Sequence, residues 1–379
     1  MKRLTIFTLA VVVLVIVVVI AFIKGGDKAP ENSGVVKMGV ILPLTGNTAI
    51  IGEPKKRAFD IALDQYNVEG KKLEVVYEDS YGTPKDGIGA FNKLLMDKSI
   101  NCFYIDLTPI VNACIPQINS SKVITFAGSA EPEVTNLSEY LFRLFAGGDQ
   151  EIEMMVDLLA KQKANNVYVL HTNELYGINS FKLLKKLFEA RGGIILGSDE
   201  YPMSNGDFKS QLIKAKSANA DKIILLGYGN EYPTLFRQSQ ELGISSDMYV
   251  CNLGGSNKTV VELPANLTEG MSFIGPRFSY LLSMNSLEPE MQEFVDRYQK
   301  RFNESPDFRA AYAYDMVNIF MDVYGNGSKT QAQLIEDIKK VQNFKGASGT
   351  ISFMENGDTK TDLITATYSD GAIELLDNE

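Results

Sequence analysis

Residues that could perform catalysis are scarce in this sequence of 379 residues. The only histidine, His171, follows a predicted strand, and no G-x-S-x-G segment provides a serine nucleophile. One histidine and three cysteines without C-x-x-C spacing, Cys102, Cys114 and Cys251, cannot supply the usual ligands of a zinc site. Carboxylates alone could still bind a hard cation. Because the GxxxxGK[ST] and GxGxxG phosphate-binding motifs are also missing, we expect a protein without enzymatic activity, metal or cofactor.

Polar and small residues gather instead directly after the predicted strands. These residues are Thr45-Gly46, Asp106-Leu107-Thr108, Gly128-Ser129, Tyr176-Gly177, Tyr228-Gly229 and Asn252. Glycine lets a backbone N–H approach a ligand, hydroxyls accept or donate hydrogen bonds, and tyrosine offers a flat apolar face with a polar tip. In open α/β sheets, ligands bind beyond the carboxyl ends of the strands, so the pattern predicts a binding cleft.

Two features of the segment after residue 105 bear on the charge of the ligand. Thr108-Pro109 is typical of a helix N-cap followed by proline in the first turn, and a helix N-terminus favours negative charge. Asp106 could pair with a ligand ammonium or accept hydrogen bonds from sugar-like or amide donors. It could equally cap the helix that begins near Thr108, and the sequence leaves both alternatives open.

The elements that position these residues alternate between strands and helices. We expect strands at Val36–Leu42, Leu73–Tyr77, Cys102–Ile105, Lys122–Ala127, Val167–Leu170, Ile194–Leu196, Lys222–Leu226 and Met248–Cys251. Between them, apolar residues recur at helical spacing, as in Phe59, Ala62, Leu63 and Tyr66. Repeated βα units predict an α/β fold with two Rossmann-like lobes of parallel sheet and flanking helices, dividing near 145–149.

The N-terminal segment predicts the location of the protein. An uncharged apolar run, Leu4–Ile23, lies between Arg3 and Lys24 and is long enough to span a membrane. The positive-inside rule then places the rest of the chain outside the cytoplasm, tethered by an uncleaved transmembrane helix. A long signal cleaved near Gly25 is the alternative, and the lack of any cysteine before Cys102 excludes a lipid anchor. With a net charge of −10, we expect no nucleic-acid partner.

The order and spacing of several motifs resemble those of the leucine/isoleucine/valine-type periplasmic binding proteins. The motifs are Gly39-Val-Ile-Leu-Pro-Leu-Thr-Gly46, Gly52 through Tyr66-Asn67, Glu78-Asp79 with Pro84, Gly128-Ser-Ala-Glu-Pro-Glu-Val-Thr135, Phe142-Arg143, Tyr176-Gly177, Arg237-Gln238 through Gly243, Tyr314-Asp315 and Gly346-Ala-Ser-Gly-Thr-Ile-Ser-Phe353. Together they cover nearly everything after the linker that ends at residue 34.

The resemblance implies a type I binding-protein fold with a three-stranded hinge. By it, residues 1–34 form the membrane anchor or signal and linker, 35–146 with 274–344 form one lobe, and 147–273 with 345–379 form the other. The ligand contacts implied by the resemblance are Leu107, Thr108, Gly128, Ala130, Tyr176, Tyr228, Gly229 and Leu253, to which the strand-end pattern adds Thr45, Asp106 and Ser129. Two positions depart from the amino-acid binders. Leu253 replaces an acid that pairs with the ligand ammonium, and Ala130 replaces a hydroxyl that meets the carboxylate, a role that Ser129 could take.

These observations predict an extracytoplasmic solute-binding protein. It would close its lobes around a small polar ligand, such as an amino acid or an amide, and deliver the ligand to the permease of an ABC importer. A receptor domain for a separate signalling partner is the first alternative. An enzyme acting on a small substrate in the cleft is the second, which the shortage of activated nucleophiles disfavours.

Overall fold

The structure is a computed structural model that describes residues 35–70, 72–131, 133–202, 206–256, 258–325 and 329–376. The apolar segment Leu4–Ile23 lies outside these ranges, so its predicted role as an anchor is not tested. Among the residues described, no helix combines the length and the hydropathy that crossing a membrane requires.

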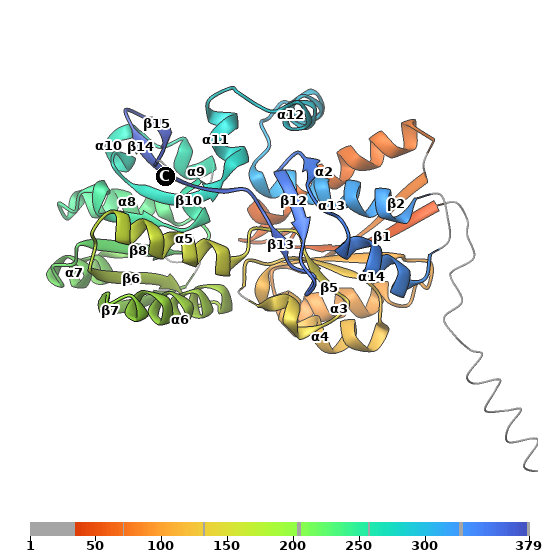
Figure 1. Cartoon of the computed structure of the whole chain (residues 1–379), viewed down its shortest axis with the longest axis horizontal. Coiled ribbons are helices and arrows are strands. Elements are labelled where there is room, and N and C mark those ends of the chain that lie inside the picture. Colours follow the sequence, from red (N-terminus) through yellow and green to blue (C-terminus); the bar gives the residue numbers. More distant parts are fainter. Residues whose placement is uncertain are drawn as a thin grey trace, which may run out of the picture.

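The first lobe is built on a five-stranded parallel sheet in the order β2-β1-β3-β4-β5 (Figure 1). Its strands are β1 (Val35–Leu42), β2 (Lys72–Asp79), β3 (Cys102–Asp106), β4 (Thr125–Gly128) and β5 (Leu141–Arg143). Its helices are α2 (Ala49–Val68), α3 (Pro84–Leu94), α4 (Thr108–Ser121), α12 (Pro289–Phe302), α13 (Phe308–Tyr324) and α14 (Gln331–Lys339).

Strand β1 explains why helices cover both faces of this sheet. Val40 packs in one core with α2 and α13, whereas its neighbour Ile41 packs in another with α3 and α4. Successive side chains of a strand point to opposite faces, so a continuous apolar run requires both faces to be buried. The predicted buried strand is therefore confirmed, as is the buried stripe of Phe59 and Ala62 on α2.

The second lobe contains a seven-stranded sheet in the order β15-β14-β10-β9-β8-β6-β7. Its strands are β6 (Asn166–Thr172), β7 (Ile194–Tyr201), β8 (Lys222–Leu226), β9 (Tyr249–Cys251), β10 (Ser272–Pro276), β14 (Leu363–Ser369) and β15 (Ala372–Leu375). Its helices are α5 (Gly148–Lys161), α6 (Leu175–Ala190), α7 (Lys209–Ser217), α8 (Tyr232–Glu241), α9 (Lys258–Val261), α10 (Ala265–Thr268) and α11 (Arg277–Ser283).

The prediction of parallel sheet holds for only part of the second lobe. Strands β6 to β10 are parallel, but β14 pairs antiparallel with β10, and β15 pairs antiparallel with β14. A tight turn at Asp370-Gly371, where both residues have positive φ, joins the last two strands. Such a turn returns the chain at once and cannot produce the crossover that a parallel pair needs.

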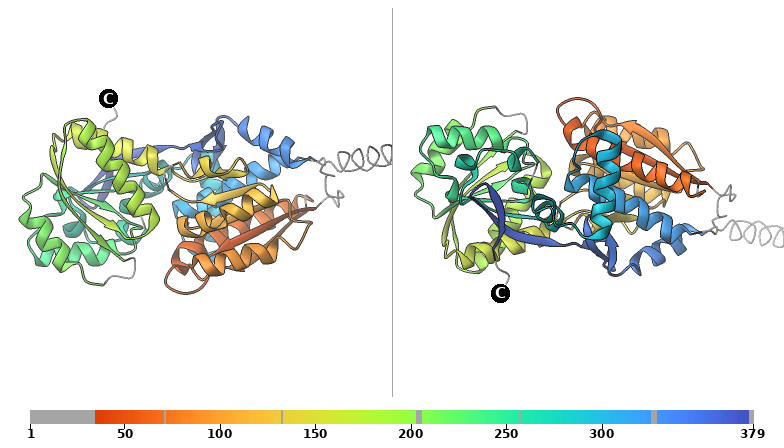
Figure 2. Two further views of the ribbon diagram at one scale, coloured as in Figure 1. Left: turned by 90° about the horizontal axis from the view of Figure 1, so that it is seen from below. Right: turned by 90° about the horizontal axis from the view of Figure 1, so that it is seen from above.

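The chain passes between the lobes three times, as the resemblance implies. The passages follow β5, α11 and β13 (Thr359–Lys360), and the last runs along one side of the molecule into β14 (Figure 2). A small sheet of β11 (Phe344–Gly346), β12 (Gly349–Phe353) and β13 lies beside the first lobe. The lobe boundaries themselves stay a prediction. The boundary expected between residues 273 and 274 falls inside β10, a strand of the seven-stranded sheet of the second lobe.

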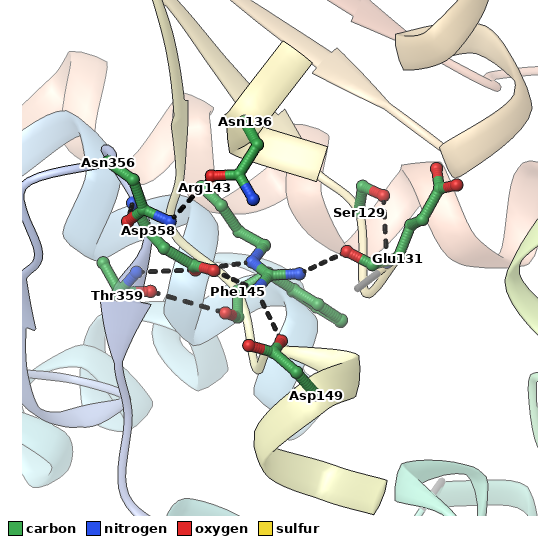
Figure 3. A network of polar contacts seen from close by, with 9 residues as sticks. All are labelled: Ser129, Glu131, Asn136, Arg143, Phe145, Asp149, Asn356, Asp358 and Thr359. Atoms are coloured by element: carbon green, nitrogen blue, oxygen red, sulfur yellow. Dashed lines mark hydrogen bonds and ion pairs between the residues drawn. The ribbon is translucent and has the colours of Figure 1, made fainter. Parts of the chain in front are cut away.

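A buried arginine ties two of these passages together (Figure 3). Arg143 ends β5, and its guanidinium donates to both carboxylate oxygens of Asp358, which precedes β13, with 2.7 Å from Nε to Oδ1. It also donates to Asp149 Oδ1 of α5 at 2.9 Å and to the carbonyl oxygen of Glu131 at 2.6 Å. One side chain thus joins the end of the first sheet, the first helix of the second lobe and the last passage.

Candidate ligand-binding cleft between the lobes

A cleft lies between the lobes at the carboxyl ends of strands from both sheets. About 490 Å³ of space free of atoms, part of it open to solvent, lies among the lining residues. From the first lobe it is lined by Ile51, Lys55, Asp106, Leu107, Thr108, Gly128, Ala130, Phe145, Phe308 and Arg309. From the second lobe it is lined by Tyr176, Gly227, Tyr228, Asn252, Leu253 and Gly254. The loops that follow β3, β4, β8 and β9 thus converge, as expected for ligand sites of open α/β sheets.

Most of the residues predicted for the site line this cleft. They are Asp106, Leu107, Thr108, Gly128, Ala130, Tyr176, Tyr228 and Leu253. Gly229 and Ser129 are not among the lining residues. Ser129 is buried, and its hydroxyl oxygen lies 2.8 Å from that of Thr108. That these residues contact a ligand remains a prediction.

Thr45 lies elsewhere, exposed at the end of β1. Its hydroxyl donates to Asp79 Oδ2 at 2.6 Å, and the backbone N–H of Leu44 donates to Asp79 Oδ1 at 2.9 Å. These bonds tie the loop after β1 to the end of β2, so the structure gives Thr45 a role in shaping a loop and no place in the cleft.

Asp106 forms a buried ion pair with Lys55, a partner that the sequence alone did not identify. Lys55 of α2 contacts Asp106 Oδ1, and both side chains are almost fully buried, at 2% and 0% exposure. Lys55 Nζ also lies 5.4 Å from the centre of the Phe145 ring, within cation–π range. Burial lowers the pKa of Lys55, which the Asp106 carboxylate partly opposes. Lys55 lies four residues before Phe59, on the buried stripe of α2. A lysine on a buried helix face indicates that a partner of opposite charge lies nearby, and this was the signal in the sequence.

The prediction of Thr108 as the N-cap of α4 is wrong, whereas the predicted proline does lie in the first turn; of the two alternatives left open for Asp106, the structure does not show the capping one. The N-cap is Leu107, at φ 70°, and no side chain caps the helix. Thr108 is the first helical residue, with its hydroxyl bonded to Ser129, while Asp106 is turned to Lys55. A non-glycine residue with positive φ is uncommon, and here it sits where the chain enters the cleft.

Gly128 is required by the ion pair. A Cβ atom at this position would lie 2.3 Å from Asp106 Oδ1 and 2.3 Å from the hydroxyl oxygen of Tyr104. Both distances are well below van der Waals contact, so a side chain here would force the Asp106 carboxylate and the Tyr104 hydroxyl to shift. Side-chain packing is therefore one physical reason for this glycine, and the predicted approach of a ligand to it stays a prediction.

A buried polar network supports the wall formed by the second lobe. The Tyr176 hydroxyl donates to Glu151 Oε2 at 2.7 Å, and the backbone N–H of Leu253 donates to the other oxygen, Oε1. Asn252 Nδ2 donates to the Tyr176 hydroxyl and to the carbonyl oxygen of Gly227, each at 2.6 Å. Burial raises the pKa of Glu151 to about 7. Since this network occupies the Tyr176 hydroxyl, the residue offers the cleft mainly its ring.

Hydrogen bonds also join the lobes directly around the cleft. Glu131, in the loop after β4, accepts from Asn112 of α4 at 2.6 Å and from Asn179 of α6 at 2.5 Å. Burial raises the pKa of Glu131 above its usual value. On the opposite side, Arg309 Nη2 donates to the carbonyl oxygen of Tyr228 at 2.9 Å. The structure therefore has the lobes closed against each other.

Comparisons with known proteins agree with this architecture. Residues 35–372 match the model of a family described as periplasmic binding protein. A Leu/Ile/Val-binding protein homolog 3 of Brucella melitensis is 25% identical over 338 residues, which cover 85% of this chain and 88% of the relative.

Two solved structures share the fold. One is the branched-chain amino acid transporter substrate binding protein of Streptococcus pneumoniae in complex with isoleucine, with 21% identity, a TM-score of 0.78, and coverage of 90% of this chain and 98% of that one. The other is a solute binding protein of an ABC transporter from Rhodopseudomonas palustris in complex with 3,4-dihydroxy benzoic acid, with 21% identity, a TM-score of 0.79, and coverage of 90% and 95%. With a family model matched over nearly the whole described chain, this protein belongs to the periplasmic binding protein family.

Proposed function

We propose that this protein captures a small polar solute in the cleft between its lobes and delivers it to the permease subunits of an ABC importer. The observation that carries the proposal is the cleft itself, lined by loops from the carboxyl ends of both sheets. Bonds such as that from Asn179 to Glu131 exist only while the lobes are together. A solute that contacts both lobes therefore favours the closed form, which the permease can distinguish from the open one.

The chemistry of the ligand is not determined by the fold. The two solved relatives bind isoleucine and 3,4-dihydroxy benzoic acid, a zwitterion and an aromatic acid, within the same architecture. Leu253 supports a ligand other than an α-amino acid here, because its apolar side chain offers no acid to an ammonium.

A thermal-shift screen of the purified protein tests the proposal. The panel consists of amino acids, amides, nucleosides and aromatic acids, and the added compound is recovered and identified after incubation. We expect saturable stabilisation by at least one compound that is recovered unchanged. Free ligand at 100 times its Kd stabilises the folded state by about 2.7 kcal/mol. Conversion of the compound to a product would refute a purely binding role, as would a panel of this breadth without a single hit.

We also propose that Leu4–Ile23 tethers the protein to the outer face of the cytoplasmic membrane. The support is the length of its apolar run and the positive charges that precede it. A tether keeps the receptor near its permease and raises the effective concentration for docking. Expression with a C-terminal tag tests this: an anchored protein stays with membranes after extraction at high pH and keeps its full length. Release of a shorter product would show cleavage.

A further inference from the structure

The two oxygens of the Asp106 carboxylate are in different situations. Oδ1 contacts Lys55, whereas Oδ2 is buried and has no hydrogen-bond partner among the residues that the structure describes. Asp106 is one of the residues that line the cleft, and its side chain is fully covered while the lobes are closed. Because buried polar atoms in folded proteins are nearly always hydrogen-bonded, Oδ2 calls for a donor from the ligand.

Lys55 offers the complementary group beside it. An ammonium has three N–H donors, and the contact with Asp106 uses one of them. Lys55 also lines the cleft. A ligand that donates to Asp106 Oδ2 therefore finds a donor for its own acceptor on the adjacent residue.

The charges that line the cleft are already balanced. They belong to Lys55, Asp106 and Arg309. Lys55 and Asp106 neutralise each other, and Arg309 lies 3.2 Å from Asp307 Oδ2. A ligand ammonium at Asp106 would sit close to the Lys55 ammonium, and a ligand carboxylate at Lys55 would sit close to the Asp106 carboxylate. In a water-poor site, either arrangement brings like charges together.

The remaining walls limit the ligand in size and polarity. Ile51, Leu107, Phe145, Leu253 and Phe308 present apolar side chains. With the lobes closed, the space among these residues is small. A short carbon skeleton fits this space with the lobes closed.

We propose that the ligand binds through an uncharged head group with a hydrogen-bond donor and an acceptor side by side, as in a primary carboxamide or a vicinal diol. The donor meets Asp106 Oδ2 and the acceptor meets the Lys55 ammonium. This inference rests on the proposed function and narrows its ligand. By this proposal, Lys55 and Asp106 are the residues that exclude charged analogues of the ligand, such as an amine or a carboxylate with the same carbon skeleton.

A series of three-carbon probes separates the alternatives. The probes are propanamide, 1,2-propanediol, propanoate, propylamine and L-alanine, with affinities measured by titration calorimetry and by competition in ligand-observed NMR. We expect propanamide, 1,2-propanediol or both to bind at least about 10-fold more tightly than the three charged probes. Equal or tighter binding of any charged probe overturns the inference, and so does a lack of binding by both neutral ones. A different result would refute the proposed function: no compound in the full thermal-shift panel would bind.

Two reciprocal substitutions test the charge balance directly. Lys55→Met leaves Asp106 without its cation, so the ratio of propylamine to propanamide affinity should rise at least about 10-fold. Asp106→Asn keeps the shape of the side chain and leaves Lys55 alone, so the ratio of propanoate to propanamide affinity should rise similarly. Lys56→Met, at the adjacent lysine outside the cleft lining, is the matched control and should change neither ratio.

Circular dichroism confirms that each variant is folded before its affinities are compared. If Lys55→Met does not fold, Asp106→Asn still decides the question. Unchanged ratios in the folded variants would show that the Lys55–Asp106 pair does not set the charge of the ligand, and the inference would be rejected.

Discussion

Replacing Arg143 by methionine removes the cation that joins the end of the first sheet to Asp358, the residue just before β13 (Figure 3). The Arg143 and Asp358 side chains are only 1% and 3% exposed. After the substitution, Asp358 keeps the backbone N–H of Thr359 at 2.7 Å but loses its counter-charge. Breaking a buried pair by removing one partner costs about 3–5 kcal/mol, so we expect a loss of about 4 kcal/mol in the free energy of unfolding.

Urea unfolding at 25 °C, followed by far-UV circular dichroism, measures this loss. The matched control is Arg191→Met, which removes an exposed pair with Asp157, whose side chains are 51% and 57% exposed. Exposed pairs contribute about 0–1 kcal/mol, so the control should unfold almost as the parent does. A loss below about 1 kcal/mol for Arg143→Met would refute the view that this buried pair stabilises the hinge region.

Three further predictions concern the cleft. Glu131→Ala removes the bonds to Asn112 and Asn179, so calorimetry should show roughly 10-fold weaker binding of any screened ligand; an unchanged Kd contradicts this. Gly128→Ala places a methyl group against Asp106 and should weaken binding at least about 10-fold in the same assay; parental affinity would show that the carboxylate can shift without loss. Glu151→Gln removes a group that favours stability at low pH and should flatten the pH dependence of urea unfolding between pH 5 and 8.

The sign of the last prediction follows from burial. Burial raises the pKa of Glu151 from 4.5 to about 7, so the folded protein holds this proton more tightly than the unfolded chain does. The stabilisation is fully present below about pH 4.5 and is lost as the pH rises through 7, with a total on the order of 3 kcal/mol. A Glu151→Gln variant whose stability falls as steeply as that of the parent would contradict the assignment.

The local pattern of the sequence was sufficient to predict the alternating elements and the placement of most cleft residues. β1 is continuous in apolar residues because both of its faces are buried, and the loops after β3 and β8 follow from strands of the same kind. The Asp370-Gly371 dipeptide is a hairpin signal that indicates the antiparallel pair of β14 and β15, but no such local signal marks the pairing of β14 with β10.

The partners of individual charges could not be predicted in the same way. Lys55 and Asp106 are 51 residues apart, and Arg143 and Asp358 are 215 apart. Neither pairing leaves a local pattern, because each depends on how helices and loops pack after the sheets have formed. Lysine on the buried stripe of α2 shows only that a partner must exist, and only the fold shows which acid it is.

Titration calorimetry of the purified protein with the best compound from the thermal-shift screen, repeated with Asp106→Asn, tests whether the solute binds in the cleft between the lobes. We expect one binding site per chain, recovery of the compound unchanged, and a clear loss of affinity in the variant. Binding of the same strength in the variant would show that the solute does not depend on Asp106, which contradicts the assignment of this side of the cleft as its binding site.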